Sequence, residues 1–190
     1  VVGVLVFVSA ARADSFAWNK DADGNWDAGA NWTLLSGTSG RTYPDDSTDV
    51  AWLTNNISVD RTISVPAGGV TVSKIEAGDA DGSHTFITDG GTISVGDPAL
   101  QLRNSGTLQF DGDVSGGSFL ELEGSGLLIV NGTMGASRVW NIKCGTLRID
   151  GGAVDSQNDN IRLFGGNRLE LGNDTPTDAP NGIQVKSGAT

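Results

Sequence analysis

Short runs of alternating apolar and polar residues return along the chain from about residue 60 onward. Each run begins with Gly or a substitute for it, continues with Thr or a similar residue, and then mostly alternates apolar with polar positions. The six runs are Gly69–Val72, Gly91–Val95, Gly106–Phe110, Gly126–Val130, Gly145–Ile149 and, more loosely, Asn167–Leu171. A period of two is typical of a strand with one buried face, and a leading Gly gives the backbone the freedom that a tight corner needs. The pattern therefore predicts a series of short strands separated by tight corners.

The runs start at positions 69, 91, 106, 126, 145 and 167, so the repeat is irregular, with most intervals near 20. Weaker strand patterns, such as Phe119–Glu123 and Val139–Lys143, lie between the runs. Two or three short strands per repeat fit one coil of a β-solenoid. We therefore expect an all-β fold, a right-handed parallel β-solenoid (β-helix), over residues 60–190. Coils stacked about 4.8 Å apart make this part a rod about 30 Å long.

The competing architecture is a sandwich of β-hairpins. Asp111-Gly112, Asn131-Gly132 and Asp150-Gly151 each follow a strand pattern directly, and such dipeptides form two-residue hairpin turns. The recurrence of one phrase at similar intervals favours the solenoid. No segment predicts an α-helix, since even residues 74–80 are too few for one and contain Gly.

The composition limits both the possible fold classes and the possible classes of binding partner. The chain has 190 residues, which suits one domain or one elongated array, and 37% of them are hydrophobic, which suffices for a core. Of its 23 acidic residues 19 are Asp, which favours turns, and only 4 are Glu, which favours helices. The net charge of −11 argues against nucleic acid or an anionic membrane as a partner. One Cys and one His exclude an internal disulfide framework and a Cys/His zinc cluster, and we predict no cofactor.

Residues 1–13 predict a truncated signal peptide. The apolar stretch Val1–Ala11 is too short to span a bilayer, which takes about 20 residues. Ala11-Arg12-Ala13 has the small-x-small pattern of a signal-peptidase site. We expect a secreted or cell-surface protein that meets an export machinery, without stable membrane insertion of this segment; the alternative is a buried first strand. Because Ile183–Thr190 ends as a strand and a turn finish, we also expect a fragment of a longer secreted protein.

Aromatic residues gather ahead of the repeats. Four of the five Trp residues stand close together in the sequence: Trp18, Trp26, Trp32 and Trp52. A solenoid needs its first coil covered, and large aromatic side chains can seal its open core. We expect an aromatic-rich N-terminal cap module over residues 14–59; the alternative is that exposed Trp faces stack on the sugar rings of a glycan.

Two groups of short motifs carry a resemblance to a known family. The repeat motifs are Ser105-Gly106-Thr107-Leu108, Gly126–Thr133 and Cys144–Gly151. The N-terminal motifs are Trp18, Gly24-Asn25-Trp26, Asn31-Trp32, Pro44 and Asp49-Val50-Ala51. Together they resemble secreted bacterial proteins with autotransporter-associated β-strand repeats, the passenger type of β-helix. The resemblance implies a surface-exposed or released passenger, often without known catalytic residues.

One acidic segment resembles the start of an EF-hand calcium loop. In Asn19–Asp27, ligand oxygens recur at alternate positions and Gly24 permits a sharp turn. Ala30 stands at the twelfth position, where such a loop needs a bidentate Glu. An Asx-rich solvated turn is therefore the preferred interpretation, and a weak calcium site is the alternative.

Two further places contain residue types used in catalysis. His84 is the only imidazole available to a Ser-His-Asp triad, but no Gly-x-Ser-x-Gly motif occurs, so we expect a solvent-exposed turn residue. Asp155, Asp159 and Arg162 put two carboxylates and a guanidinium on one loop or strand edge, as a β-helix polysaccharide lyase needs for Ca²⁺ and proton transfer. Since acid-rich turns occur throughout the chain, a solvated turn is preferred there too.

Cys144 and the Asn-x-Ser/Thr sequences have simpler interpretations. Cys144 follows Trp140 and Ile142 in the same alternation, so we expect it inside the coil as an inert core residue. Matches to the N-glycosylation sequon begin at Asn31, Asn56, Asn131 and Asn173, and they matter only in a host that uses the sequon.

Taken together, the sequence predicts a non-catalytic stalk or adhesin-like passenger, secreted or at a bacterial surface. Outward Thr, Ser, Asn and Asp side chains would contact surface glycans or other cells. The competing classes are an enzyme on the same coil, either a polysaccharide lyase or a glycoside hydrolase, and a carbohydrate-binding module centred on the Trp cluster. Because a fold does not fix a function, no catalytic, cofactor-binding or metal-binding residue is assigned.

Overall fold

A computed structural model describes residues 13–96, 100–102, 106–116, 119–136, 139–142, 145–150, 153–156, 161–163, 168–171, 177–178 and 183–185. Apart from one 3-10 turn, η1 (Gly29–Asn31), every regular element in these residues is a strand. The strands are β1 (Ser15–Trp18), β2 (Gly24–Asn25), β3 (Trp32–Ser36), β4 (Asp46–Leu53), β5 (Arg61–Val65), β6 (Val70–Ala77), β7 (Thr85–Gly90), β8 (Ile93–Val95), β9 (Leu100–Leu102), β10 (Thr107–Phe110), β11 (Val114–Gly116), β12 (Phe119–Glu123), β13 (Leu127–Val130), β14 (Thr133–Ala136), β15 (Val139–Ile142), β16 (Thr146–Ile149), β17 (Ala153–Ser156), β18 (Ile161–Leu163), β19 (Arg168–Leu171), β20 (Thr177–Asp178) and β21 (Ile183–Val185).

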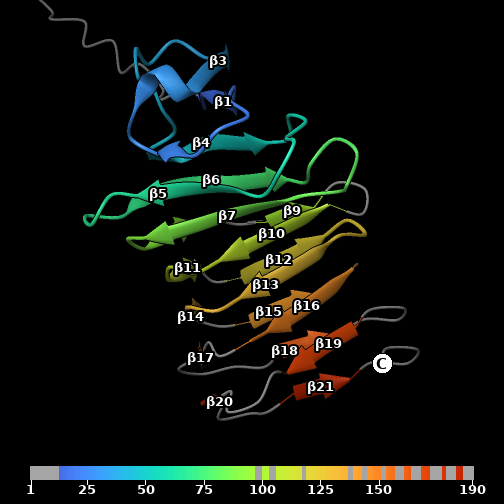
Figure 1. The fold of residues 1–190 in the computed structure, drawn as a ribbon. Helices are drawn as coiled ribbons and strands as arrows, with labels where there is room; N and C mark the ends of the chain where they lie inside the picture. The colour runs from blue at the N-terminus through green and yellow to red at the C-terminus, as the bar shows by residue number, and fades with distance from the viewer. Residues whose placement is uncertain are drawn as a thin grey trace, which may run out of the picture.

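The strands form two sheets that run along the molecule (Figure 1). One sheet holds seven strands in the order β2, β5, β7, β10, β13, β16 and β19, all paired in parallel. The other holds fourteen strands, and two rows of it branch from the long strand β6. One row continues through β8, β11, β14, β17 and β20, and the other through β9, β12, β15, β18 and β21. Each described coil from β7 onward therefore passes through three short strands, which confirms the predicted all-β parallel solenoid.

The register advances by one coil at a time. In the seven-stranded sheet, the aligned partners on successive strands are Phe86, Leu108, Leu128, Leu147 and Leu169. The last four belong to the predicted phrases that begin at positions 106, 126, 145 and 167. Because these strands are parallel, Asp111-Gly112 and Asn131-Gly132 are corners between the two sheets and not hairpin turns. The hairpin sandwich is thereby excluded.

Two of the six repeated phrases supply the other sheet. Gly69 precedes β6 and Gly91 precedes β8, both in the fourteen-stranded sheet. In these first coils the strands of the seven-stranded sheet are β5 and β7, and neither of them begins with the repeated phrase. The phrase at Gly91 thus leads into the fourteen-stranded sheet, whereas the phrase at Gly106 leads into the seven-stranded sheet. Because these two phrases lie on different sheets, they are less than one full coil apart, which explains their short spacing. The weaker predicted strands between the phrases are confirmed as β12 and β15, and residues 74–80 contain the end of β6 and not a helix.

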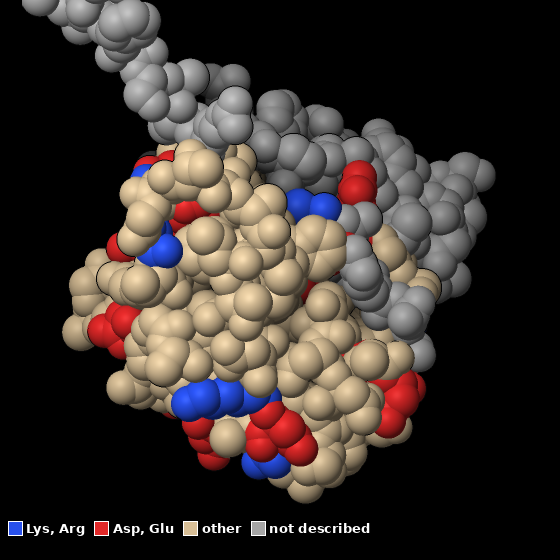
Figure 2. All heavy atoms as spheres, turned by 90° about the horizontal axis from the view of Figure 1, so that it is seen from above, with Lys and Arg blue, Asp and Glu red and all other residues tan. Residues whose placement is uncertain are grey.

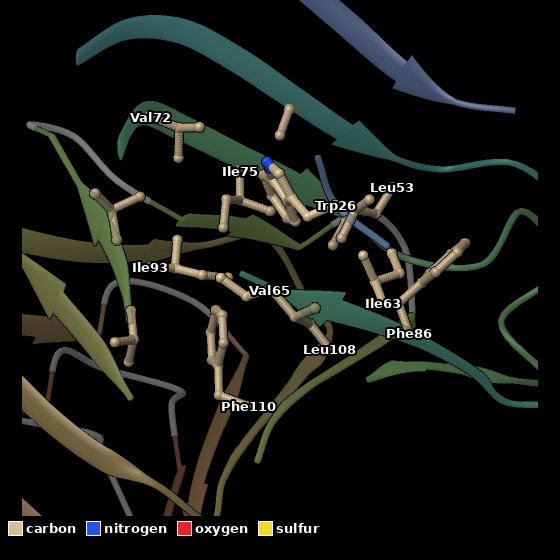
Figure 3. Packing of buried hydrophobic residues seen from close by; sticks show 14 of the residues in the cluster. Trp26, Leu53, Ile63, Val65, Val72, Ile75, Phe86, Ile93, Leu108 and Phe110 are labelled. Carbon is tan, nitrogen blue, oxygen red and sulfur yellow. The ribbon is translucent and has the colours of Figure 1, made fainter. Parts of the chain in front are cut away.

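Alternate side chains of both sheets point inward and form one hydrophobic core. In β10, β13 and β16, half-buried and buried residues alternate along the strand. Figure 3 shows Ile63, Val65 and Phe110 of the seven-stranded sheet meeting side chains of the opposite sheet, such as Ile75 and Ile93. The core therefore runs as a continuous column between the sheets.

Short Asp side chains tie successive coils together at the corners. Oδ1 of Asp113 accepts a hydrogen bond from the backbone N–H of Thr133, at 2.9 Å, one coil later. The same type of bond joins Asp23 to Thr62 (2.9 Å), Asp45 to Thr71 (3.0 Å) and Asp60 to Thr85 (2.8 Å). A short acidic side chain reaches a neighbouring backbone with few rotatable bonds to immobilise, which gives a physical reason for the excess of Asp over Glu.

An aromatic cap covers the N-terminal end of the core. Trp18, Trp26 and Trp32 are buried, with ring centroids 5.3 Å apart for Trp18 and Trp32 and 4.9 Å apart for Trp26 and Trp32. Nε1 of Trp26 donates to the carbonyl of Pro44 (2.8 Å), and Nε1 of Trp32 donates to the carbonyl of Trp26 (2.6 Å). The aromatic-rich cap is confirmed, and the buried faces of these three rings are not available to a sugar. Trp52 is half-buried.

The cap and the solenoid share their first strands. Within residues 14–59, β2 pairs with β5 and β4 pairs with β6, so both sheets already begin there. β1 then pairs in parallel with β4 and antiparallel with β3, which makes β3 the outermost strand of the fourteen-stranded sheet at this end. Figure 1 shows β1 and β3 stacked beyond β4 at the end opposite the C-terminus.

Candidate functional site

A network of charged side chains fastens the loop between β3 and β4. The guanidinium of Arg41 donates to both carboxylate oxygens of Asp49, at 3.1 and 3.3 Å, and to Oδ2 of Asp46 at 2.7 Å. Asp49 is fully buried and also accepts the backbone N–H groups of Asp14 and Asp45, each at 3.2 Å. A buried carboxylate with this many donors is satisfied, so it can anchor the loop.

The carboxylates of this network titrate differently because their surroundings differ. Burial raises the pKa of Asp49, while the N–H groups of Asp45 and Asp14 and the guanidinium of Arg41 oppose that rise. The hydroxyl of Ser39 and nearby backbone N–H groups lower the pKa of Asp14. The hydroxyl and N–H of Thr48, together with Arg41, lower the pKa of Asp46.

The fastened loop borders a groove on the outer surface. One cavity of about 250 Å³ is lined by Gly40, Arg41, Thr42, Tyr43 and Asp45. A second cavity of about 260 Å³ continues onto the first coils, lined by Asp45, Gly68, Gly69, Val70, Thr71, Thr92 and Ser94. Both cavities open to solvent and share Asp45, so we treat them as one groove, the Asp45 groove.

The groups in the Asp45 groove are suited to hydroxyl-rich ligands. Oδ1 of Asp45 is held by the N–H of Thr71, while within the described residues Oδ2 makes no hydrogen bond. Tyr43 packs partly against the core, and the hydroxyl of Ser94 lies 2.9 Å from that of Ser115. The positive charge of Arg41 is already paired with Asp46 and Asp49. It is therefore not available to bind an anionic ligand in the groove. Carboxylate and hydroxyl oxygens can form hydrogen bonds with a ligand that is rich in hydroxyl groups.

In the predicted EF-hand-like segment, two Asp side chains form hydrogen bonds with the next coil. Oδ1 of Asp21 accepts the N–H of Ser58 (3.0 Å) and Nε–H of Arg61 (2.8 Å), and Oδ1 of Asp23 accepts the N–H of Thr62. Two of the expected ligand oxygens therefore already accept hydrogen bonds from the chain itself. Among the residues that the structure describes, no group of three or more His, Cys, Asp or Glu could hold a metal ion.

His84 lies in the turn before β7, as expected, but it is half-buried and not fully exposed. Its Nδ1 is 3.8 Å from Oδ1 of Asp60. The backbone N–H groups of Ser83 and His84 donate to the buried carboxylate of Asp79, which also accepts the N–H of Ile57. These contacts shape a turn.

The predicted lyase-like group falls largely outside the described residues. Asp159 lies outside them, and of Asp155 and Arg162 only the backbone is described, in β17 and β18, which belong to different rows of the sheet. Cys144 is also outside the described residues.

The four sequons differ in their accessibility. Asn31 is buried and donates to the carbonyl of Asn25 at 2.9 Å, so the folded chain does not present it. Asn131 donates to Asp111 at 2.7 Å, and Asn56 is exposed. Asn173 lies outside the described residues.

The residues between β3 and β4 that line the Asp45 groove lie outside the patterns that are visible in the sequence. Arg41, Asp45 and Tyr43, the only Tyr of the chain, belong to no strand pattern and to none of the motifs above. Pro44 and Asp49 entered only as parts of the family-like motif. The structure gives those two residues roles in folding, since Pro44 accepts the Trp26 hydrogen bond and Asp49 anchors Arg41. A lone Tyr among Arg, Pro and three Asp residues was the available signal.

Comparisons with known proteins give no relative from which to transfer a function. The chain matches no protein-family model, no curated protein and no solved structure. Among the described residues, no helix is long and apolar enough to span a membrane.

Proposed function

We propose that this chain is part of a secreted, non-catalytic β-solenoid passenger that stands at a cell surface and binds neutral saccharides in the Asp45 groove. The observation that carries the proposal is the groove itself, which Asp45 lines together with Tyr43 on one side and with Thr71, Thr92 and Ser94 of the first coils on the other. The solenoid behind it acts as a stiff stalk, because each strand is held by hydrogen bonds to the coils before and after it.

The lining of the groove supports binding over hydrolysis. Among the residues that line it, Asp45 is the only one with a carboxylate, and its Oδ1 is already bonded to Thr71. Glycoside hydrolysis generally uses a pair of carboxylates on either side of the scissile bond. The nearby carboxylates of Asp46 and Asp49 are paired with Arg41.

The surroundings of Asp14 support secretion with cleavage after Ala13. Asp14 is buried, whereas Ala13 is exposed, and the backbone N–H of Asp14 donates to the buried carboxylate of Asp49. A mature chain that begins at Asp14 has its ammonium group at this hydrogen bond, which a charged donor strengthens. Mass spectrometry of the secreted protein tests this: a first residue other than Asp14 contradicts it.

Retention on immobilised polysaccharides tests saccharide binding. The probes are a neutral glucan, mannan and xylan, with acidic pectate for comparison. We expect the wild-type chain to be retained on at least one neutral polymer and not on pectate, because the chain carries a charge of −11. Asp45→Asn keeps an oxygen for the Thr71 N–H but replaces the second acceptor with a donor, so binding should weaken about tenfold or more while the fold persists.

The matched control is Asp111→Asn, an exposed acidic residue at a corner farther along the solenoid. It removes the same charge and should leave retention unchanged. The proposal fails if no neutral polymer retains the wild type, or if Asp45→Asn binds as tightly as Asp111→Asn does.

A further inference from the structure

The outermost strand at the N-terminal end, β3, has one unpaired edge. Among the described strands β3 pairs only with β1, so its other edge presents backbone N–H and C=O groups without a strand partner. Trp32 is buried, but the rest of the strand, from Thr33 to Ser36, is exposed. Sheet edges of this kind are templates for pairing with another strand, and many proteins block them with Lys or Pro, neither of which occurs in β3.

A column of the hydrophobic core ends uncovered at this edge. Ile75, Ala51 and Phe16 are aligned partners on successive strands, and all three are fully buried. The next residue in register is Leu34, which is 44% exposed, and its neighbour Leu35 is 55% exposed. Among the described residues the only other exposed large hydrophobic residue is Val59. One more strand beyond β3 would cover Leu34 as β3 itself covers Phe16.

The charge distribution favours a second copy of this chain as the source of that strand. The chain has a net charge of −11, so two copies repel each other over most of their surfaces. No charged residue occurs between Asp27 and Arg41, the segment that contains β3. Figure 2 looks down on this end and shows a broad area without Lys, Arg, Asp or Glu, with the charged side chains mostly around it.

We infer that β3 pairs antiparallel with β3 of a second copy and joins two solenoids end to end. An antiparallel pair of identical strands is self-complementary about a twofold axis, as the commonest dimers are. The pairing satisfies both free edges and places Leu34 of each copy over the core of the other. It goes beyond the proposed function, because it uses the end of the sheet and not the Asp45 groove.

Light scattering coupled to size-exclusion chromatography, over a range of concentrations, tests the dimer. We expect the wild-type chain to be dimeric and Leu34→Lys to weaken dimerisation about tenfold or more, because the pairing would cover the new ammonium group at the end of the core column. Thr33→Lys should act in the same direction. The control Val59→Lys makes a similar change at a hydrophobic residue that is 49% exposed, away from β3, and should remain dimeric. Far-UV circular dichroism checks that each variant is folded.

Hydrogen exchange locates the contact. In the wild type, exchange of the β3 amides should slow as concentration rises, and in Leu34→Lys it should not. Higher salt should tighten the dimer, because it screens the repulsion between the two acidic chains. A monomeric wild type with fast β3 exchange overturns the inference, as does β3 protection that is independent of concentration, which means that another segment of the same chain covers the edge. A dimer that Leu34→Lys leaves intact also overturns it. Asp45→Asn should dimerise normally, so this test is separate from saccharide binding.

Discussion

At the residue scale, the recurring device is an Asp carboxylate that binds the backbone of the next coil. Asp21 is the most strongly shifted example, because the N–H and hydroxyl of Ser58 and the guanidinium of Arg61 lower its pKa to about 2. A carboxyl whose pKa is lower in the folded chain than in the unfolded chain stabilises the fold when it is ionised. These bonds therefore make the fold sensitive to acid.

We predict that Asp21→Asn destabilises the chain at neutral pH and that the difference disappears in acid. The stabilising contribution of Asp21 is fully present above its ordinary pKa of 3.8 and is lost as the pH falls toward about 2. Urea unfolding of the two proteins between pH 7 and pH 2 measures this. The control is Asp27→Asn, an exposed residue without a hydrogen bond in the described structure. A difference between wild type and Asp21→Asn that stays constant across this range would contradict the assignment.

At the element scale, the corners after the seven-stranded sheet require glycine because adjacent coils approach closely. A Cβ added to Gly132 would lie 2.3 Å from the carbonyl oxygen of Gly112, which occupies the same corner one coil earlier. A Cβ on Gly68, in the turn before β6, would meet nothing within 4 Å. A comparison of the two positions therefore separates the steric clash of an added Cβ with the neighbouring coil from the effect of glycine replacement on the unfolded chain.

Gly132→Ala should lower the free energy of unfolding by about 1–3 kcal/mol, since the backbone of one coil must move away from its neighbour. Gly68→Ala should leave that free energy unchanged or raise it by less than about 1 kcal/mol, because it restricts only the unfolded chain. Chemical denaturation of the two variants provides the comparison. Equal losses in both would show that the close approach at Gly132 is not what limits stability.

The strands could be predicted from the sequence better than the groove, because strands leave a periodic pattern of apolar residues and an irregular loop does not. The alternation of apolar and polar residues at 107–110, 127–130 and 146–149 shows which side chains of each strand point into the core. The return of the same phrase at similar intervals indicates the length of one coil. The pattern does not distinguish the two sheets, because every strand of a solenoid has one inward face, so the Gly69 and Gly91 phrases looked like the others. The groove depends on Arg41, Asp49 and Asp14, which meet across an irregular loop that has no period to read.

At the scale of the whole molecule, the coils behave as stacked units, each in contact mainly with its two neighbours. Phe110 is aligned with Val130, and Val130 with Ile149, so residues 111–130 make up one full coil of this stack. Removing them joins Phe110 to Asn131 and brings Phe110 into register with Ile149. The parallel pairing and the inward alternation are kept on both sides of the junction.

Deletion of residues 111–130 should therefore give a folded protein about 4.8 Å shorter. Its circular dichroism per residue should match that of the full chain, and its unfolding should remain cooperative, because the stability of a solenoid is close to a sum of coil and interface contributions. Deletion of residues 111–120, half as many, leaves an incomplete coil and should abolish folding. Circular dichroism and small-angle X-ray scattering measure both variants. If the full-coil deletion unfolds as completely as the half-coil deletion, the coils are not interchangeable, and the chain depends instead on contacts specific to each level of the stack.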